Sequence, residues 1–576
     1  MKKYLLLLLF LIPSFVSASI YVTIEDDNIV VSDGYNEITD YSNILDYNNR
    51  TLTIKEGAVI NELYYNYIDL TITSNNKVAY IGYISHSSYS FDNNFHTLTI
   101  KDYTNGENSP ISFCSSAYAT NVEVINSAIY NLDYISDSFY SSLEMGITIK
   151  NSTLADSGGT NSGWVFSEGP IIFDNVKYNA GMIQSNSNHI LINNSDLVIS
   201  AGLYTDGGKG YIEIYNSKIE RAREDDYSRI ESYRSRFDEK PNIRIYNSII
   251  NVRRMYSTIN DDVHSEIKDS TINLSGSFVF NSYVDVINTN IKLGAEFDPY
   301  YGINMKDSSI IGNTYTVIDG GWNNPAKSYI DNCDIYFKQF ASLKDVDITN
   351  SRFITDSYFS MEGSVNIDHS YIKAVNENDR DNNTLIVHGD LRINNSYVYF
   401  EQLNNKHVLY AEESNHVIDI NPGLQLTDKD NKSLIIKYLN DSYGAYYEGF
   451  DDVLSSSIKS APKITVTLKV KGGTWADGTT DDIVITKDIW SKLTSDDIPT
   501  GMLGDGEGYW EVVPSTEDYI KDDLEFVYVF GDVKGEEEIT NPKTGVFTYT
   551  SLIVALLMIS LYIHHKYKCK TLYKYN

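Results

Sequence analysis

Four groups of side chains contain residue types that could carry out acid–base chemistry. A pair of carboxylates, one donating and one accepting a proton, is the machinery of glycoside hydrolysis, and paired acids beside a basic side chain suit a polysaccharide lyase. The acidic groups are Asp225-Asp226, Asp261-Asp262 with His264, Asp319 before Gly320-Gly321-Trp322, and Asp379-Arg380-Asp381. The adjacent Arg253-Arg254 stands nearest to the second cluster, so Arg253, Asp261 and Asp262 are the fallback catalytic candidates.

The surroundings of these clusters do not favour catalysis. None of the pairs returns at the same position of a neighbouring repeat, and the chain lacks the Asn-Thr-Asp and Gly-His-Gly motifs of pectin-type hydrolases. The ten histidines have no metal-ligand spacing, and no EF-hand loop is present. The sequence therefore predicts no enzyme, no cofactor and no dedicated metal site, although its acidic surface could hold calcium loosely. An extracellular polysaccharide lyase or glycoside hydrolase is the alternative.

A short repeat dictates the elements that must position any site. Its pattern is apolar, any, apolar, any, Asn or Asp, Ser or Thr, any, apolar, as in Ile212-x-Ile214-x-Asn216-Ser217-x-Ile219. Copies follow at intervals of 18 to 31 residues, for example around Asn247, Asn350 and Asn395. Alternation with a period of two predicts short strands with one buried face. Since such a strand cannot bury that face alone, the copies must stack as a solenoid.

A right-handed parallel β-helix fits this repeat best. Ile149, Ile192 and Ile214 should then fill the interior, and each Asn should lie at a bend, because Asn tolerates left-handed backbone angles and its amides can stack along the axis. A leucine-rich repeat is the competing solenoid, but the variable period does not supply its fixed leucine positions. Cys333 occupies a Ser position of the repeat, and we interpret it as a small residue standing in for Ser.

Tyrosine is abundant, with 47 residues, and several lie at outward positions beside the repeat. Outward aromatic side chains can stack on sugar rings or contact a partner protein, and they also suit strands for structural reasons alone. The predicted binding residues are Tyr215, Tyr246, Tyr336, Tyr371, Tyr397 and Tyr399. A segment over 220–240, dense in both charge signs and poor in strand formers, is expected to protrude as a loop or short helix.

Both ends of the chain carry targeting signals. Residues 1–18 combine Lys2-Lys3, an apolar run and small residues, which predicts a cleaved signal peptide. Near the other end, Asn541-Pro542-Lys543-Thr544-Gly545 precedes an apolar stretch over 546–563 and a basic tail, which predicts a transmembrane helix with a cytoplasmic C-terminus.

This three-part end resembles the sortase sorting signal of Gram-positive surface proteins, whose pentapeptide is usually Leu-Pro-x-Thr-Gly. The resemblance implies cleavage after Thr544 by a sortase-like transpeptidase and linkage to the cell wall. Asn541 departs from the usual Leu, which leaves the sortase class open and makes a plain membrane anchor the alternative. The segment over 461–530 resembles small anchor-proximal β modules of such proteins, through Gly473-x-Trp475-x-Asp477-Gly478-Thr479.

The formal net charge of −32 argues against a nucleic acid partner. The three cysteines form no disulfide framework.

The predicted fold class is therefore all-β, a right-handed parallel β-helix followed by a small β-grasp-like module and one C-terminal transmembrane helix. The expected order is signal peptide 1–18, N-terminal cap 19–50, solenoid 51–426, C-terminal cap and linker 427–460, small module 461–530, acidic leash 531–540, and sorting signal, membrane segment and basic tail 541–576. The predicted function is that of an extracellular, surface-anchored adhesin-like rod for glycans or host proteins. Structural surface coverage without a specific ligand is a further alternative.

Overall fold

The computed structural model describes residues 19–530 except for short internal segments. Those segments are 26, 67, 87–95, 118–119, 138–145, 157–162, 187, 207–209, 225, 234–241, 319–325, 378–381, 405, 500 and 503–507. The signal peptide, the acidic leash and the sorting signal predicted above lie outside the described residues. The chain forms two compact units.

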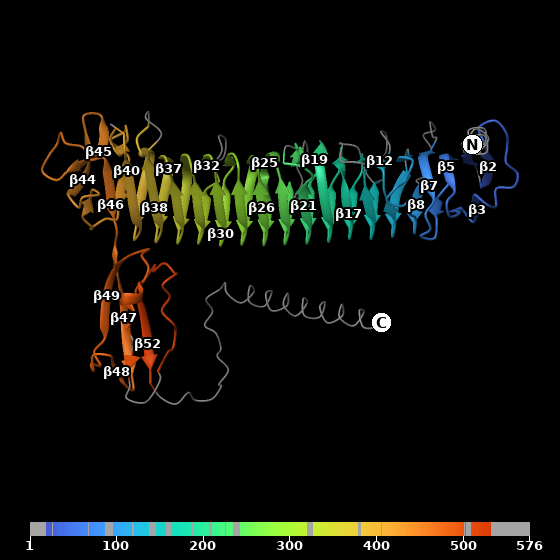
Figure 1. Cartoon of the computed structure of the whole chain (residues 1–576). Helices are drawn as coiled ribbons and strands as arrows, with labels where there is room; N and C mark the ends of the chain where they lie inside the picture. The colour runs from blue at the N-terminus through green and yellow to red at the C-terminus, as the bar shows by residue number, and fades with distance from the viewer. Residues whose placement is uncertain are drawn as a thin grey trace, which may run out of the picture. The chain divides into compact units, whose positions relative to one another are not determined.

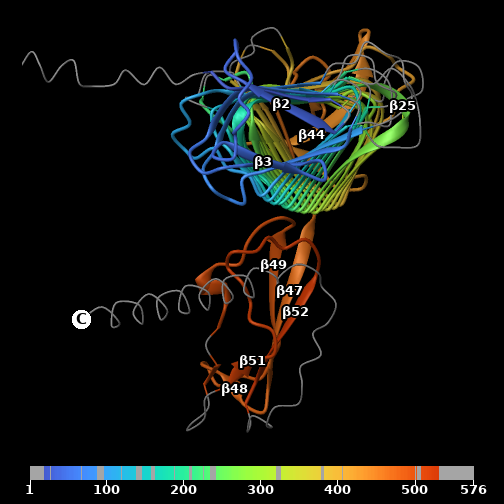
Figure 2. The same ribbon diagram turned by 90° about the vertical axis from the view of Figure 1, so that its right-hand side faces the viewer.

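The larger unit is a parallel β-solenoid with strands stacked along one axis (Figure 1). The parallel strands pair in three ladders, here called faces A, B and C. The faces surround the interior when the unit is viewed from its end (Figure 2). Each turn of the chain passes through a strand of face A, then B, then C. This arrangement confirms the predicted parallel solenoid, and a leucine-rich repeat is wrong because each turn carries three strands.

Face A contains the apolar strands of the repeat. Its strands are β4 (Thr51–Ile54), β6 (Leu70–Thr73), β8 (His96–Lys101), β10 (Thr120–Ile125), β13 (Ile147–Lys150), β16 (Ile171–Asp174), β18 (Ile190–Asn193), β20 (Ile212–Tyr215), β23 (Ile243–Tyr246), the second parts of β25 (Arg254–Lys268) and β27 (Phe278–Ile287), β30 (Ile303–Lys306), β33 (Ser328–Asp331), the second parts of β35 (Ala341–Thr349), β37 (Phe359–Asp368) and β39 (Leu385–Asn394), and β42 (Ile418–Ile420).

Face B follows the recurring bend of each turn. Its strands are β11 (Ala128–Ile129), β14 (Thr153–Ala155), the first parts of β17 (Lys177–Ser185) and β19 (Asp196–Asp206), β21 (Lys218–Arg221), β24 (Ile249–Val252), β26 (Thr271–Leu274), β28 (Asn290–Leu293), β31 (Ser309–Gly312), β34 (Asp334–Phe337), β36 (Arg352–Thr355), β38 (Tyr371–Asn376) and β40 (Tyr397–Gln402).

Face C completes the turn. It contains β1 (Tyr21–Glu25), β5 (Val59–Asn66), β7 (Tyr80–His86), β9 (Phe113–Ala117), β12 (Leu132–Asp137), β15 (Trp164–Ser167), the second parts of β17 and β19, β22 (Arg229–Tyr233), the first parts of β25 and β27, β29 (Phe297–Pro299), β32 (Thr316–Ile318), the first parts of β35, β37 and β39, and β41 (Leu409–Tyr410).

The interior is one continuous apolar core. Alternate residues point inward, so that Ile149, Phe173, Ile192 and Ile214 lie in register on successive strands of face A and are fully buried. Burying one such side chain stabilises the fold by about 1.5–3 kcal/mol. The predicted inward positions of Ile149, Ile192 and Ile214 are confirmed.

The bend between faces A and B explains the polar part of the repeat. Asn216 and Asn247 have φ of 49°, in the left-handed region, and the Asn247 amide donates to Asn216 Oδ1 at 2.8 Å. The neighbouring Ser hydroxyls form a second ladder, in which Ser217 Oγ accepts from the Ser195 backbone N–H at 3.0 Å. Cys333 takes the Ser position and donates from Sγ to the Asp331 carbonyl at 3.1 Å, as predicted for a Ser substitute.

Antiparallel strands close both ends of the solenoid. At the N-terminal end, β2 (Asn28–Ser32) pairs with β1 and β3 (Leu45–Asn48) pairs with β4. At the other end, β46 (Ser457–Ser460) covers β40, and β43 (Leu426–Thr427), β44 (Ser433–Leu439) and β45 (Ser442–Tyr447) complete the cap. The edges of β1, β4 and β40 that these antiparallel strands cover are therefore not free to pair with another chain.

The smaller unit comprises 467–484, 494–514 and the chain from 525. A four-stranded sheet has the order β49 (Ile483–Asp488), β47 (Lys463–Lys471), β52 (Leu524–Val529) and β51 (Tyr509–Trp510), and β48 (Thr474–Trp475) pairs with β50 (Gly501–Met502). Within the described part of the chain, the only helical element is a 3-10 turn at Ser495–Asp497.

Two predictions require correction. The fold class that ends in a transmembrane helix is wrong for the structure as described, because no helix in that part of the chain is long and apolar enough to span a membrane; the predicted segment over 546–563 itself lies outside the described residues. The segment over 220–240 is not simply a protruding loop or helix, because Arg229–Tyr233 forms β22 of face C.

Candidate functional site

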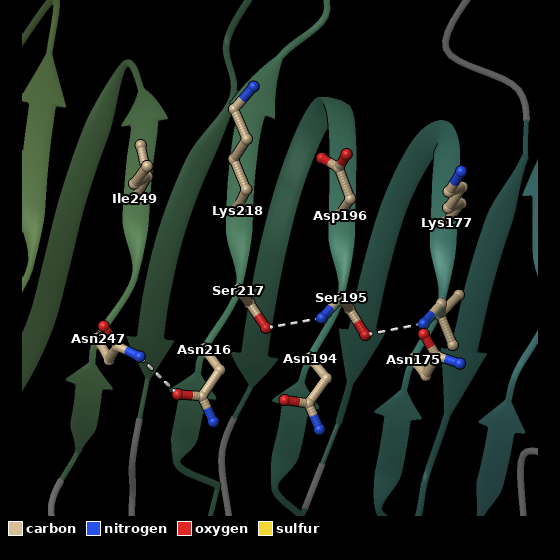
Figure 3. A pocket seen from close by; sticks show the side chains of 11 residues that line it. Asn175, Lys177, Asn194, Ser195, Asp196, Asn216, Ser217, Lys218, Asn247 and Ile249 are labelled. Atoms are coloured by element: carbon tan, nitrogen blue, oxygen red, sulfur yellow. Dashed lines mark hydrogen bonds between the residues drawn. The ribbon is translucent and has the colours of Figure 1, made fainter. Parts of the chain in front are cut away.

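The shallow groove in Figure 3 lies over the bend between faces A and B. It has a volume of about 430 Å³ and is lined by ladder residues together with Lys177, Asp196, Lys218 and Ile249. Ser195 and Ser217 are joined to neighbouring turns by hydrogen bonds, and Asn247 donates to Asn216. Because these polar groups already serve the fold, the groove offers few groups that a ligand could use.

The predicted tyrosines do not form one site. Tyr215 and Tyr246 lie on face A, with ring centroids 5.6 Å apart, whereas Tyr336, Tyr371, Tyr397 and Tyr399 lie on face B. Most have partners within the fold. The Tyr215 hydroxyl donates to Glu213, the Tyr336 hydroxyl to Asp356 and the Tyr399 hydroxyl to Glu401, and Tyr246 donates to Glu266.

Tyr371 and Tyr397 stack on each other with centroids 4.6 Å apart and an interplanar angle of 4°. The Trp490 ring, which belongs to the same unit, lies 6.3 Å from Tyr371. These rings therefore contribute to packing between turns. Their contacts are those expected of structural tyrosines on a solenoid.

The fallback catalytic candidates are not brought together by any described contact. Arg253 is exposed and its guanidinium carbon lies 4.3 Å from the centre of the Tyr227 ring. The side chains of Asp261 and Asp262 lie outside the described residues. No group of three or more His, Cys, Asp or Glu side chains that could hold a metal ion occurs in the part of the chain that the structure describes.

Face C brings together charged and aromatic side chains that the sequence did not single out as a site. Their positions follow from the register of three adjacent strands, in which Tyr204, Glu231 and Tyr256 are aligned, as are Gly202, Arg229 and Arg254. With Tyr233, these side chains form the arginine–tyrosine patch, which we define as Tyr204, Arg229, Glu231, Tyr233, Arg254 and Tyr256.

Glu231 is the anchor of the arginine–tyrosine patch. Its side chain is 0% exposed, and its carboxylate lies 3.3 Å from Arg229 Nη1 and 3.8 Å from Arg254 Nη1. The Tyr233 hydroxyl donates to Glu231 Oε2 at 2.9 Å. Burying a charged carboxylate is costly unless it has partners, and Glu231 is in contact with both arginines.

Each arginine also lies over a tyrosine ring. The guanidinium carbon of Arg229 is 4.8 Å from the centre of the Tyr204 ring, and that of Arg254 is 4.8 Å from the centre of the Tyr256 ring. Arg229 Nε donates to the Tyr204 hydroxyl at 2.5 Å. Burial raises the pKa of Tyr233 to about 12, with a further contribution from Glu231, so this phenol keeps its proton at neutral pH.

The patch borders a hollow of about 400 Å³. The lining residues are Met182, Gln184, Tyr204, Asp206, Arg229, Glu231 and Tyr233. Trp164 on β15 aligns with Met182 on β17, and its side chain is 47% exposed. Face C therefore offers aromatic surface and hydrogen-bonding groups along several consecutive turns.

Gly202 permits the close packing of β19 against β22 beneath the patch. Its φ is +155°, and a Cβ atom at this position would lie 2.4 Å from the Arg229 carbonyl oxygen. A side chain here would push the Arg229 backbone away.

Sequence reasoning missed this patch although it noted the charges of Arg229 and Glu231. The alternation Arg229, Glu231, Tyr233 outward with Ile230 and Ser232 inward is a strand signal, but it is short and charged. Comparison with protein-family models finds no matching family, and comparison with curated proteins finds no matching relative.

Proposed function

We propose that the protein is an extracellular, adhesin-like β-solenoid that binds glycans along face C. The arginine–tyrosine patch is the observation that supports this proposal. Tyrosine rings supply flat apolar area for sugar rings at a small entropic cost, and guanidinium groups supply several donors for hydroxyl oxygens. The parallel turns repeat at about 4.8 Å, so an extended chain of sugars could contact several strands.

The shape of the site favours binding rather than turnover. The hollow at the patch is open, and its most buried carboxylate, Glu231, is in contact with two arginines and the Tyr233 hydroxyl. A general acid in glycoside hydrolysis must instead have its carboxyl group within reach of the glycosidic oxygen. Glu231 is thus suited to holding arginines in place.

The location outside the cell rests on the sequence. The signal peptide over 1–18 and the pentapeptide Asn541–Gly545 support export and attachment by a sortase-like transpeptidase, and the net charge of −32 suits a soluble surface rod. Recovery of Thr544 in amide linkage to a cell-wall peptide would test this attachment. Recovery of the protein with residues 545–576 intact would contradict it.

The experiment for glycan binding uses the purified chain 19–540 on an array of glycans, with matrix proteins as a second panel. Replacing Tyr256 by Ala should weaken glycan binding about tenfold, which corresponds to about 1.4 kcal/mol, because the variant loses the apolar area of the ring. Tyr399→Ala on face B is the matched control and should bind as the parent does.

Three outcomes would overturn the proposal. Binding to matrix proteins alone would make the protein a protein adhesin. New reducing ends or unsaturated products would make it a carbohydrate-active enzyme. Equal loss of binding in Tyr256→Ala and Tyr399→Ala would place the site elsewhere.

A further inference from the structure

Two guanidinium groups share one buried carboxylate in the arginine–tyrosine patch. Glu231 can accept hydrogen bonds at two oxygens, and one of them already accepts from Tyr233. Each arginine carries five N–H donors, so Glu231 engages only a part of them. The Arg229 and Arg254 side chains remain 41% and 38% exposed. Donors are therefore left on the solvent side of both groups.

These donors are held in place before any ligand arrives. Arg229 is fixed by Glu231, by the Tyr204 ring and by its bond to the Tyr204 hydroxyl. Arg254 is fixed by Glu231 and by the Tyr256 ring. Because the two residues are aligned on adjacent strands, their guanidinium groups are neighbours along the axis. A rigid pair loses less conformational entropy on binding than two free arginines would.

The patch is less acidic than the chain as a whole. Two positive groups face one buried negative group, whereas the chain carries a net charge of −32. Asp206 also lines the hollow and works against an anionic ligand there. The other acidic side chains repel polyanions, and salt screens this repulsion beyond a Debye length of about 8–10 Å at physiological ionic strength. An anionic group would consequently be held only where the arginines contact it directly.

We propose that the arginine–tyrosine patch selects saccharides that carry an anionic group, and that Arg229 and Arg254 bind this group. Planar guanidinium groups match carboxylates and other oxyanions in a bidentate geometry, and the tyrosines contact the sugar ring that bears the anion. This inference rests on the glycan binding proposed above and names its substrate class. Carboxylated and sulfated sugars present the same oxyanion chemistry to the arginines.

The test compares matched pairs of probes on the purified chain 19–540. One pair is hyaluronan oligosaccharide and its carboxyl methyl ester, and the other is dextran sulfate and dextran. Isothermal titration should give at least tenfold tighter binding of the charged member of one pair, which identifies the anion as carboxylate or sulfate. Arg254→Gln should abolish this difference, whereas Arg392→Gln, a half-exposed arginine paired with Asp390 on face A, should preserve it.

Arg254→Lys is a conservative variant that keeps the positive charge beside Glu231. Thermal unfolding of each variant shows whether it is folded. Arg254→Lys should retain part of the preference because Lys binds an oxyanion as a point charge without the bidentate geometry. Equal binding of charged and neutral probes, with Tyr256→Ala still weakening both, would overturn the anionic preference and leave glycan binding intact. No binding of any saccharide would overturn both.

Discussion

Two buried carboxylates on face C illustrate how the environment of a single residue decides its chemistry. Glu231 lies beside two arginines and a tyrosine hydroxyl. Asp137, only 1% exposed, has no such cation in its described contacts; it accepts from the Ser167 hydroxyl at 2.7 Å and from the Glu168 backbone N–H at 3.1 Å. Burial accordingly raises the pKa of Asp137 to about 7.

Replacing Asp137 by Asn should stabilise the solenoid at neutral and alkaline pH. The folded pKa lies above the unfolded value of 3.8, so the parent is fully stable with respect to this group below about pH 4 and loses stability up to about pH 7. The loss is on the order of 4 kcal/mol at about 1.4 kcal/mol per pKa unit. At pH 4 the variant and the parent should have equal unfolding midpoints in urea. At pH 8 the midpoint of the variant should be higher. The exposed Asp196→Asn should leave the parent's pH profile unchanged, and a destabilised Asp137→Asn at pH 8 would contradict the account.

The recurring element of the fold is a strand, a left-handed bend and a second strand. Asn supplies the bend because its backbone adopts positive φ at a lower cost than most residues, and its amide joins the next turn. Ser supplies a hydroxyl that accepts from a backbone N–H of the preceding turn, as Ser217 Oγ does from the Ser195 N–H. The first residue supplies the backbone angle and the second the hydroxyl, although His369 replaces Asn at one bend and Cys333 replaces Ser at another.

Asn216→Ala should destabilise the turn at face A by about 2–3 kcal/mol. Of this, about 1–2 kcal/mol comes from the left-handed backbone of a residue with a Cβ, and about 1 kcal/mol from the lost bond to Asn247. Hydrogen exchange over residues 212–221 should speed up in the variant. Asn216→Gly is the matched control, because it relieves the backbone cost and should lie between the parent and the Ala variant. Identical exchange in Gly and Ala variants would show that the backbone angle has no energetic role.

At the scale of the whole solenoid, each turn is stabilised by the turns beside it. The core is continuous from Val22 to Ile458, so the outermost turns would expose apolar surface and open strand edges if they were uncovered. The antiparallel strands β2, β3 and β46 meet this need. These capping strands end a stack of turns that could otherwise be extended by further strands.

Ending the chain after residue 426 should cause self-association. This truncation removes β44, β45 and β46 and uncovers β40, whose backbone groups can then pair with another molecule. Light scattering should reveal oligomers that grow with protein concentration, whereas a chain ending after Ser460 should stay monodisperse. A monodisperse chain 19–426 would show that the cap is dispensable for solubility.

The sequence by itself determined the parallel solenoid, the inward isoleucines and the role of the Asn bend, because these depend on neighbours within one repeat and recur many times. It also identified Cys333 as a Ser substitute. It misjudged the segment over 220–240, where Arg229–Tyr233 forms a strand. The tyrosines that it predicted as binding residues lie on faces A and B, and their role in binding stays a prediction.

Only the tertiary structure decided which residues meet on face C. Tyr204, Glu231 and Tyr256 are about 25 residues apart in sequence, and loops of different length separate them. Their alignment follows from strand register, which the core residues of all three strands fix together. A site built across turns depends on those loop lengths as well as on residue types, and for this reason the repeat could predict the scaffold without predicting the arginine–tyrosine patch.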